Sequence, residues 1–362
     1  MSVTTLYPGF VGVSAFTTEI CRPSSVGDEL RFRGVNIVDL VGIRPYDDVW
    51  RLLVDDYFGA GPLAEITDEE VMAELDAAGT PRIALQRMIL RLGTMRAMQP
   101  APGADPDALR DDLAVLTMAY AVGLGALLAR RSGRPPHAGG DGDAEAGVAA
   151  RLVRAWRGDV DARVVGVVDS VLSTVAEHGT SASTFTARVV ASTGADAAAC
   201  VTAGLCAIGG PRHGGATRGV TALLRDLAAD PTQAPAYVGR LLDDGRRLPG
   251  MGHRVYRERD PRVPILRGLA EAVDAPLIPV AEAYQRSAEE ELVRRKGSGR
   301  RLPANPDLWL PVVLDGIGVP DEFMDAFLAG ARIGGWSAHI VEQVAGGGPL
   351  LRPDDLYVGR TG

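Results

Sequence analysis

The stretch that most constrains the fold is residues 113–129, LAVLTMAYAVGLGALLA, which carries no charged side chain over 17 residues. That length lies at the lower limit for a membrane span. Asp111 and Asp112 precede the stretch, Arg130 and Arg131 follow it, and the chain contains no second stretch of this kind. We therefore expect a helix that is buried on all sides, in the core or at a subunit interface, within a protein that does not enter a membrane.

Further helix signals recur along the chain. Thr67 and Glu70 form a capping box ahead of an apolar run, and Thr80 is followed by a proline suited to the first helical position. Strand candidates are short and lie near the start, around Val11–Thr18 and Glu29–Arg33. Helical patterns are expected at 148–175, 183–208, 216–229, 232–246, 262–274, 279–295, 306–318 and 320–346. The pattern predicts a mainly α-helical protein with at most small N-terminal β-hairpins.

Composition narrows the class of protein. Aromatic residues make up only 5% of the chain, which favours helices packed through small side chains over an aromatic-rich β-sandwich. The net charge of −8 argues against a general nucleic-acid binder. No Walker-type or dinucleotide-binding glycine motif is present, so nucleotide hydrolysis and NAD chemistry have no support.

Three cysteines, Cys21, Cys200 and Cys206, lack metal-binding spacing, and an odd, low count is typical of a reducing cytoplasm. Cys200 and Cys206 lie in an apolar stretch and are expected to be buried. The N-terminal residues lack a basic region and are interrupted by Pro8, so we expect no signal peptide and a cytoplasmic protein. His137 lies in a low-complexity loop and is expected to have no chemical role.

The other four histidines lie in short motifs bounded by glycine or serine. These are His178 in EHGTSASTF, His213 in GPRHGGA, His253 in GMGHRVY and His339 in GGWSAH. Histidine can gain or lose a proton near neutral pH, and neighbouring glycines allow a ligand to approach closely. Asp307 follows in a third loop, PANPDLW. His213, His253 and Asp307 therefore suggest an acid–base site assembled from distant segments, whereas His339 is expected to be structural.

Longer motifs around these residues resemble citrate synthase. They are the segment 181–216, LPGMGHRVYRERDPR, ARIGGWSAHIVEQ followed by GPLLRPDDLYVG, and the early LRFRGVNIVDLV, which is similar to that family's RGYDI-type opening. The resemblance spans nearly the whole chain and is strongest to the short bacterial enzymes, a group that includes methylcitrate synthases. It implies an all-helical, two-domain homodimer, with a large domain at 1–212 and 313–362 and a small domain at 213–312 that closes over the cleft.

By this resemblance the enzyme condenses acetyl-CoA with oxaloacetate to give citrate and CoA. Asp307 matches the family's base, His213 the residue that stabilises the enolate, and His253 the residue that polarises the ketone. His178 matches a histidine that contacts the acceptor. These assignments are chemically sensible, because removing a weakly acidic methyl proton needs both a base and a donor to the forming oxyanion.

Arg262, Arg332 and Arg352 match the family's carboxylate-binding arginines, and planar guanidinium groups bind carboxylates in bidentate fashion. Outside these motifs, surface charges would be the preferred interpretation of Arg262 and Arg352. The resemblance implies that Arg352 reaches the partner subunit's site.

The resemblance also places CoA near a basic cluster ahead of the Asp307 loop, although cations at a helix C-terminus would explain the cluster as well. It implies no metal and no tightly bound organic cofactor. The CoA-binding candidates are Met251, Gly252, Arg294, Arg295, Lys296, Arg300 and Arg301.

Three positions depart from the family pattern. Ser181 replaces an asparagine, Arg212 replaces a leucine beside His213, and Pro306 replaces a small aliphatic residue before Asp307. These changes leave open the identity of the acceptor. A 2-methylcitrate or alkylcitrate synthase, a citryl-CoA lyase and a non-catalytic CoA-binding paralogue remain alternatives.

Overall fold

The computed structural model describes residues 5–24, 29–59, 61, 63–75, 78–100, 106–136, 146–296 and 302–360, so His137 lies outside the described residues. Fourteen α-helices dominate these ranges, which confirms the predicted mainly α-helical class. They are α1 (Tyr46–Asp55), α2 (Asp68–Glu74), α3 (Pro81–Met95), α4 (Pro106–Arg131), α5 (Val148–Arg157), α6 (Ala162–Thr174), α7 (Ala182–Ser192), α8 (Ala197–Ile208), α9 (Ala216–Ala228), α10 (Ala234–Asp243), α11 (Arg262–Ala272), α12 (Ile278–Lys296), α13 (Pro306–Gly316) and α14 (Met324–Ala345).

Helix α4 contains the uncharged stretch and lies in the core, as predicted. It is long and apolar enough to cross a membrane, and 94% of its most apolar window is buried inside the protein. Its neighbours approach closely: a Cβ on Gly125 would lie 2.3 Å from the carbonyl oxygen of Leu152 in α5. The Tyr120 hydroxyl donates a hydrogen bond of 3.0 Å to the carbonyl of Ala326 in α14. Apolar burial and close backbone packing therefore hold α4 at the centre.

The predicted helix starts are present, but two of the predicted helices are each divided in two. The hydroxyl of Thr67 accepts from the backbone N–H of Glu70, whose side chain accepts in return, which completes the capping box. The 148–175 segment forms α5 and α6, because Gly158 ends α5 in the left-handed conformation and Asp161 caps α6. The 183–208 segment divides in the same way at Asp196, which caps α8.

The small sheet contains β1 (Cys21–Pro23), β2 (Leu30–Phe32) and β3 (Val35–Asn36), paired antiparallel in that order. β2 confirms the strand expected at Glu29–Arg33. The strand expected at Val11–Thr18 is wrong, because that segment has no strand conformation and its end is held by side-chain contacts. A carboxylate oxygen of Glu342 accepts from the Thr18 hydroxyl at 3.2 Å and from the next backbone N–H at 3.0 Å.

One buried-cysteine prediction is confirmed and one is wrong. Cys200 lies in the core, whereas Cys206 is exposed on the surface of α8. Its sulfur accepts a hydrogen bond of 3.0 Å from the side-chain amide of Gln86 in α3. The two cysteines lie six positions apart on α8 and face different directions, so the apolar composition of the segment did not reveal which one faces solvent.

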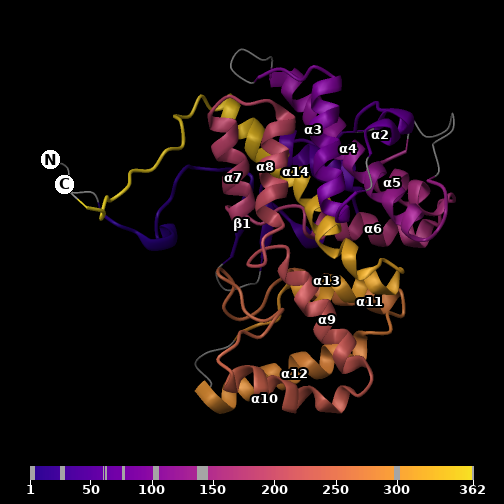
Figure 1. Ribbon diagram of the computed structural model, residues 1–362, viewed down its shortest axis with the longest axis vertical. Coiled ribbons are helices and arrows are strands. Elements are labelled where there is room, and N and C mark those ends of the chain that lie inside the picture. The colour runs from indigo at the N-terminus through magenta and orange to yellow at the C-terminus, as the bar shows by residue number, and fades with distance from the viewer. Residues whose placement is uncertain are drawn as a thin grey trace.

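The helices form an upper group, α1 to α8 with α14, and a lower group that includes α9, α10 and α12 (Figure 1). Helix α13 packs against α9, α11 and α12, and α14 runs from the lower side back through the upper group. The loop 209–215 joins α8 to α9 and so connects the two groups. The N-terminal segment and the C-terminal tail extend from the same side of the upper group in the view of Figure 1.

Candidate active site

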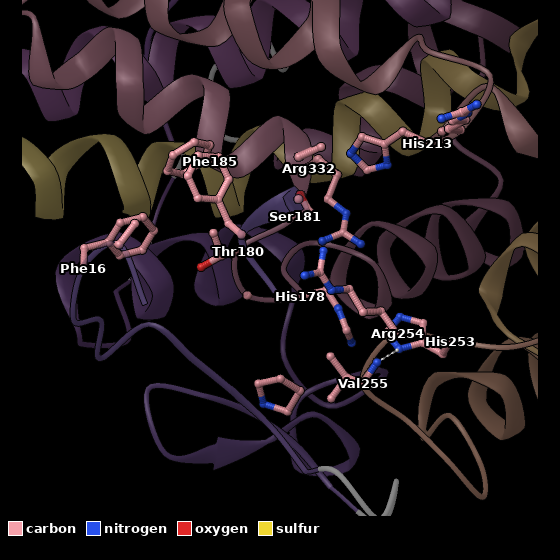
Figure 2. Close-up of a pocket in the computed structure, with 18 of the residues that line it drawn as sticks. Phe16, His178, Thr180, Ser181, Phe185, His213, His253, Arg254, Val255 and Arg332 are labelled. Carbon is pink, nitrogen blue, oxygen red and sulfur yellow. Dashed lines mark hydrogen bonds between the residues drawn. The ribbon is translucent and has the colours of Figure 1, made fainter. Parts of the chain in front are cut away.

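A cavity of about 1080 Å³ gathers the three histidines and the aspartate that the sequence singled out for acid–base and acceptor chemistry. His178 comes from the loop before α7, His213 from the turn before α9, and His253 from the loop before α11. Asp307 comes from the first turn of α13. Figure 2 shows the three imidazoles and the guanidinium of Arg332 around the same space. The distant segments therefore converge on one cavity, as the motifs predicted.

The cavity is strongly positive. Five arginines line it, and Asp307 is the one carboxylate among the described lining residues. An excess of guanidinium groups inside a concave, partly dry site favours a small ligand with more than one negative charge. The five arginines are Arg212, Arg254, Arg262, Arg332 and Arg352.

His178, His253 and Tyr256 form a compact ring cluster on one wall. The ring centroids of His178 and His253 are 4.6 Å apart with an edge-to-face angle of 79°. Tyr256 lies 5.2 Å from His178 and 4.8 Å from His253. Burial, together with the charge of Arg262, lowers the pKa of His178 well below its usual value. Its Nε2 is buried and has no hydrogen-bond partner among the described residues.

The hydrogen bonds of His253 fix its tautomer. Its Nδ1 accepts from the backbone N–H of Val255 at 3.0 Å (Figure 2). It also accepts from the backbone N–H of Tyr256 at 3.2 Å. A nitrogen that accepts two hydrogen bonds carries no proton, so the proton lies on Nε2. Burial, assisted by the charge of Arg262, lowers the pKa of His253 to about 4. His253 is therefore a neutral N–H donor at physiological pH.

His213 is held by a chain of hydroxyl groups at the start of α7. Its Nε2 lies 2.8 Å from the Ser183 hydroxyl, which in turn lies 3.1 Å from the Ser181 hydroxyl. Ser181 also caps α7 by accepting from the backbone N–H of Thr184. Burial, followed by the charge of Arg332, lowers the pKa of His213 to about 4, so this ring is also neutral near pH 7. The serine at position 181 therefore keeps a capping function here.

Asp307 is positioned by the start of α13. The side chain of Asn305 caps the helix by accepting from the backbone N–H of Asp307 at 2.9 Å, and Pro306 occupies the first helical position. Proline is well tolerated there, because that position needs no backbone donor. Burial raises the pKa of Asp307 to about 6, while the charges of Arg262 and Arg332 act in the opposite direction. Asp307 is therefore mainly ionised at pH 7 yet more basic than an exposed carboxylate.

Two of the arginines differ in how their charge is balanced. Arg262 is buried and makes two side-chain hydrogen bonds to Asp260, of 2.9 Å and 2.7 Å. Arg332 is 7% exposed, and its Nε and Nη1 have no hydrogen-bond partner among the described residues. Buried N–H groups without partners are costly. Those of Arg332 are covered by the surrounding protein, so Arg332 is the less well compensated of the two cations.

The remaining predicted residues are more peripheral. Arg352 is exposed on the C-terminal tail and lines the cavity of its own chain, and Arg212 is exposed beside His213. Met251 bridges to Ala304, and the N–H of Gly252 donates to Pro303 at 2.6 Å, so this pair lies beside the loop that leads to Asp307. Arg294 and Arg295 are exposed and both bond Glu291. The Lys296 side chain, Arg300 and Arg301 lie outside the described residues.

Three contributing residues escaped the sequence analysis: Ser183, Tyr256 and Asp260. All three lie inside the motifs that pointed to the site, in SASTF, HRVY and RDPR respectively. An acidic residue two positions before a candidate carboxylate-binding arginine, as in Asp260 and Arg262, is a usable signal for an ion pair. His339 is buried away from the cavity, bonded to Arg188, as expected for a structural histidine.

The family model described as "Citrate synthase, C-terminal domain" matches residues 9–354. The chain belongs to the citrate synthase family. It is 40% identical over 357 residues to the Mycobacterium tuberculosis protein named "Putative citrate synthase 2", covering 97% of this chain and 92% of that protein. It is also 31% identical to "2-methylcitrate synthase 1" of Corynebacterium glutamicum, covering 99% of this chain and 97% of that protein.

Solved citrate synthases share its fold. The enzyme from Thermoplasma acidophilum, solved with carboxymethyl coenzyme A and oxaloacetate, matches with a TM-score of 0.86 at 22% identity, over 99% of this chain and 97% of that one. The Thermotoga maritima enzyme matches with a TM-score of 0.81 at 22% identity, over 99% and 97% of the two chains. The expected all-helical citrate synthase fold is confirmed, and this citrate synthase is an enzyme of the acyltransferase type.

Proposed function

We propose that this citrate synthase condenses acetyl-CoA with oxaloacetate and water to give citrate and CoA. The observation that carries the proposal is the convergence of His213, His253 and Asp307 on one arginine-rich cavity. The cavity offers a base in Asp307, neutral imidazoles in His213 and His253, and several cations, which suits a carbon acid reacting with a dianionic acceptor. The solved Thermoplasma relative binds an acetyl-CoA-like thioether and oxaloacetate, which supports the same substrate pair here.

The first step is removal of a methyl proton from acetyl-CoA by Asp307. The negative charge that forms on the thioester oxygen is stabilised by an N–H of His213. The Ser183 hydroxyl lies 2.8 Å from Nε2 of His213, and either group can donate in that hydrogen bond. We assign Ser183 as the donor, which places the proton on Nδ1 for the substrate. A neutral His213 donates this hydrogen bond without needing an extra proton.

In the second step the enol carbon forms a bond to the ketone carbon of the acceptor. The Nε2–H of His253 polarises the ketone and transfers its proton to the new alkoxide oxygen. The two backbone N–H groups at Nδ1 hold the ring so that Nε2 is the donating atom. Water then cleaves the citryl thioester: a proton from the water restores His253, the proton held by Asp307 goes to the CoA thiolate, and the new carboxyl group releases one to solvent. Citrate and CoA then leave.

The acceptor's carboxylates are bound by Arg262 and Arg332, with His178 beside them. Asp260 holds one edge of Arg262 and thereby presents the rest of the guanidinium to the cavity. Arg352 lies on an extended tail, and we propose that in a cytoplasmic homodimer it completes the partner's site. The exposed tail and the surplus of arginines in the cavity support this assignment.

The proposed two-domain organisation follows from where the cavity residues originate. His213, His253 and Asp307 come from 213–312, whereas His178 and Arg332 come from the rest of the chain. A boundary at 212–213 falls in the turn between α8 and α9, and the second boundary belongs after α13, because a hinge would not divide a helix. Closure of the two parts would exclude water and limit premature thioester hydrolysis.

CoA is proposed to approach from the side of Met251 and Gly252. The backbone of this pair lies next to the loop that ends at Asp307, so a thioester bound there would present its methyl group to the base. Arg294 and Arg295 remain candidates for its phosphates, because both are exposed near the C-terminal end of α12.

Thiol release from acetyl-CoA in the presence of oxaloacetate tests the proposal directly. Activity that depends on both substrates is expected, whereas bound oxaloacetate without any thiol release would refute the proposed reaction. Propionyl-CoA is measured beside acetyl-CoA, because one relative is named a 2-methylcitrate synthase. A higher kcat/KM with propionyl-CoA than with acetyl-CoA would instead assign 2-methylcitrate synthase activity.

A further inference from the structure

Glu177, the residue before His178, is a fully buried carboxylate that the proposed chemistry does not use. One of its oxygens, Oε1, lies 3.3 Å from Nε2 of His339. The other, Oε2, has no hydrogen-bond partner among the residues that the structure describes. Burying a carboxylate lowers the stability of the folded protein unless the surrounding groups compensate its charge. Groups beside the acceptor site are therefore expected to compensate Glu177.

The proton on His339 can be placed from its neighbours. Nη1 of Arg188 lies 3.0 Å from Nδ1 of His339, and a guanidinium can only donate. Nδ1 of His339 therefore accepts, and its Nε2 carries the proton and donates to Glu177. His339 is neutral in this arrangement and positions Glu177 without cancelling its charge.

The remaining contacts of Glu177 lead to α14 and Arg332. A Cβ on Gly335 would lie 2.2 Å from Oε2 of Glu177 and 2.5 Å from the carbonyl oxygen of Ala176. The carboxylate therefore packs against the α14 backbone, one turn beyond Arg332. Burial lowers the pKa of Arg332 to about 10, and the charge of Glu177 opposes that shift. The charge of Glu177 acts in the same direction on Arg188, so Glu177 compensates two nearby cations, one of which is the guanidinium expected to bind the acceptor.

The same network reaches the segment at the edge of the cavity. Arg188 bonds Glu342 and lies over the ring of Phe16, 3.7 Å from its centroid. Glu342 in turn accepts from Thr18 and from the backbone N–H of Glu19. Phe16 lines the cavity, on the far side of Phe185 and Thr180 from His253 in Figure 2. One chain of polar groups, buried at Glu177 and His339 and partly exposed at Glu342, therefore joins the His178 loop to this N-terminal segment.

We propose that Glu177 is a positioning residue for the acceptor, fixing the loop of His178 and the guanidinium of Arg332 through its contacts with His339 and Gly335. The inference rests on the proposed function, because it concerns how the same site holds its acceptor. Loss of the charge of Glu177 and loss of the position of Arg332 predict opposite effects on acceptor binding. Removing a negative charge near Arg332 would by electrostatics alone tighten binding of a dianion, whereas losing the position of Arg332 weakens it.

Glu177→Gln is the first test, since it keeps the side chain's size but removes the charge that attracts Arg332, so the guanidinium is no longer held in position. We expect KM for oxaloacetate to rise about tenfold, while kcat and KM for acetyl-CoA change by less than about twofold. The matched control is Asp68→Asn, which neutralises another buried carboxylate, paired with Arg151 and absent from the cavity lining. The control should leave KM for oxaloacetate unchanged.

Gly335→Ala is the second test, because it keeps every charge and displaces Glu177 with a methyl group. It should raise KM for oxaloacetate in the same way. Gly330→Ala is its control on the same helix, where the new methyl group would meet the ring of Tyr120 at 3.0 Å instead. Thermal unfolding of all four variants shows whether each one folds.

Calorimetric binding of oxaloacetate reads acceptor affinity without turnover and separates the two hypotheses. Wild-type protein that binds oxaloacetate and releases no thiol contradicts the proposed reaction, and the variants still test the positioning of the acceptor. Normal wild-type turnover with unchanged or tighter oxaloacetate binding in Glu177→Gln and Gly335→Ala overturns the role of Glu177. A parallel loss in the two controls would also overturn it, because the effect would then be general destabilisation.

Discussion

The pKa of Asp307 predicts a specific acid limb in the pH profile of the enzyme. Burial raises this pKa to about 6, and the reaction needs the ionised form as a base. Below that pH the ionised fraction of Asp307 decreases, so the activity falls as the pH is lowered. Above that pH Asp307 stays ionised and the activity is retained. The perturbation is a change of pH from 8 to 4, measured as kcat/KM for oxaloacetate.

The magnitude follows from the titration of one group. With a pKa of about 6, roughly nine-tenths of Asp307 is ionised at pH 7 and roughly one-tenth at pH 5. The expected loss of kcat/KM between these two values is therefore about tenfold. His213 and His253, with pKa values of about 4, remain mostly neutral over that range. Below pH 5 they begin to gain protons, and the slope should become steeper.

The assay is thiol release across the pH series at fixed ionic strength, with protein recovered at pH 7 as a check for irreversible unfolding. At saturating oxaloacetate the limb should move to higher pH, because the bound carboxylates neutralise Arg262 and Arg332, which otherwise lower the pKa of Asp307. A flat profile between pH 8 and 5 would refute the assignment of Asp307 as the base. A limb that moves to lower pH when oxaloacetate saturates would refute the electrostatic argument.

Further predictions concern single substitutions. Asp307→Asn should reduce kcat by about 10²–10⁴-fold with calorimetric oxaloacetate binding nearly intact, and lost binding with normal turnover would contradict its role. Ser183→Ala should reduce kcat about fivefold without unfolding, because the neighbouring imidazole loses the hydrogen bond that sets its tautomer; an unchanged kcat would argue against that function. Arg352→Ala should raise KM for oxaloacetate, and mixing it with Arg262→Ala protein should restore activity if sites are shared between subunits, whereas verified exchange without recovery excludes sharing. Gly125→Ala should lower the free energy of unfolding by about 1–3 kcal/mol, since its methyl group would overlap the α5 backbone, and an unchanged thermal midpoint would contradict that packing.

The fold was predictable where local chemistry decides it. Thr67 and Thr80 predict where helices begin, because their hydroxyls accept hydrogen bonds from backbone N–H groups of the first turn. This local interaction does not depend on distant parts of the chain. The strand prediction at Val11–Thr18 was wrong, because a strand forms only beside a second strand, which the local sequence does not specify. That segment is instead tied to Glu342, more than 300 positions away, by the hydrogen bond from Thr18.

The candidate site shows the same division. Glycine-bounded motifs indicated His213 and His253, but not which ring nitrogen carries the proton. That depends on Ser183 for one ring and on two backbone N–H groups for the other. The ion pair of Arg262 with Asp260 was also missed, although the two lie close together in sequence, because spacing alone does not distinguish a buried pair from surface charges.

Charge and burial act in opposite directions on Asp307, and this opposition links binding to catalysis. An empty cavity holds Arg262 and Arg332 near the carboxylate, which favours its ionised form and makes it a weaker base. An acceptor with two carboxylates cancels those charges, so the pKa of Asp307 rises toward the value that burial alone would set. A monoanion would cancel less of the charge and activate Asp307 less. The arginines therefore select a dianionic acceptor twice, first through its affinity and again through the strength of the base that its binding produces.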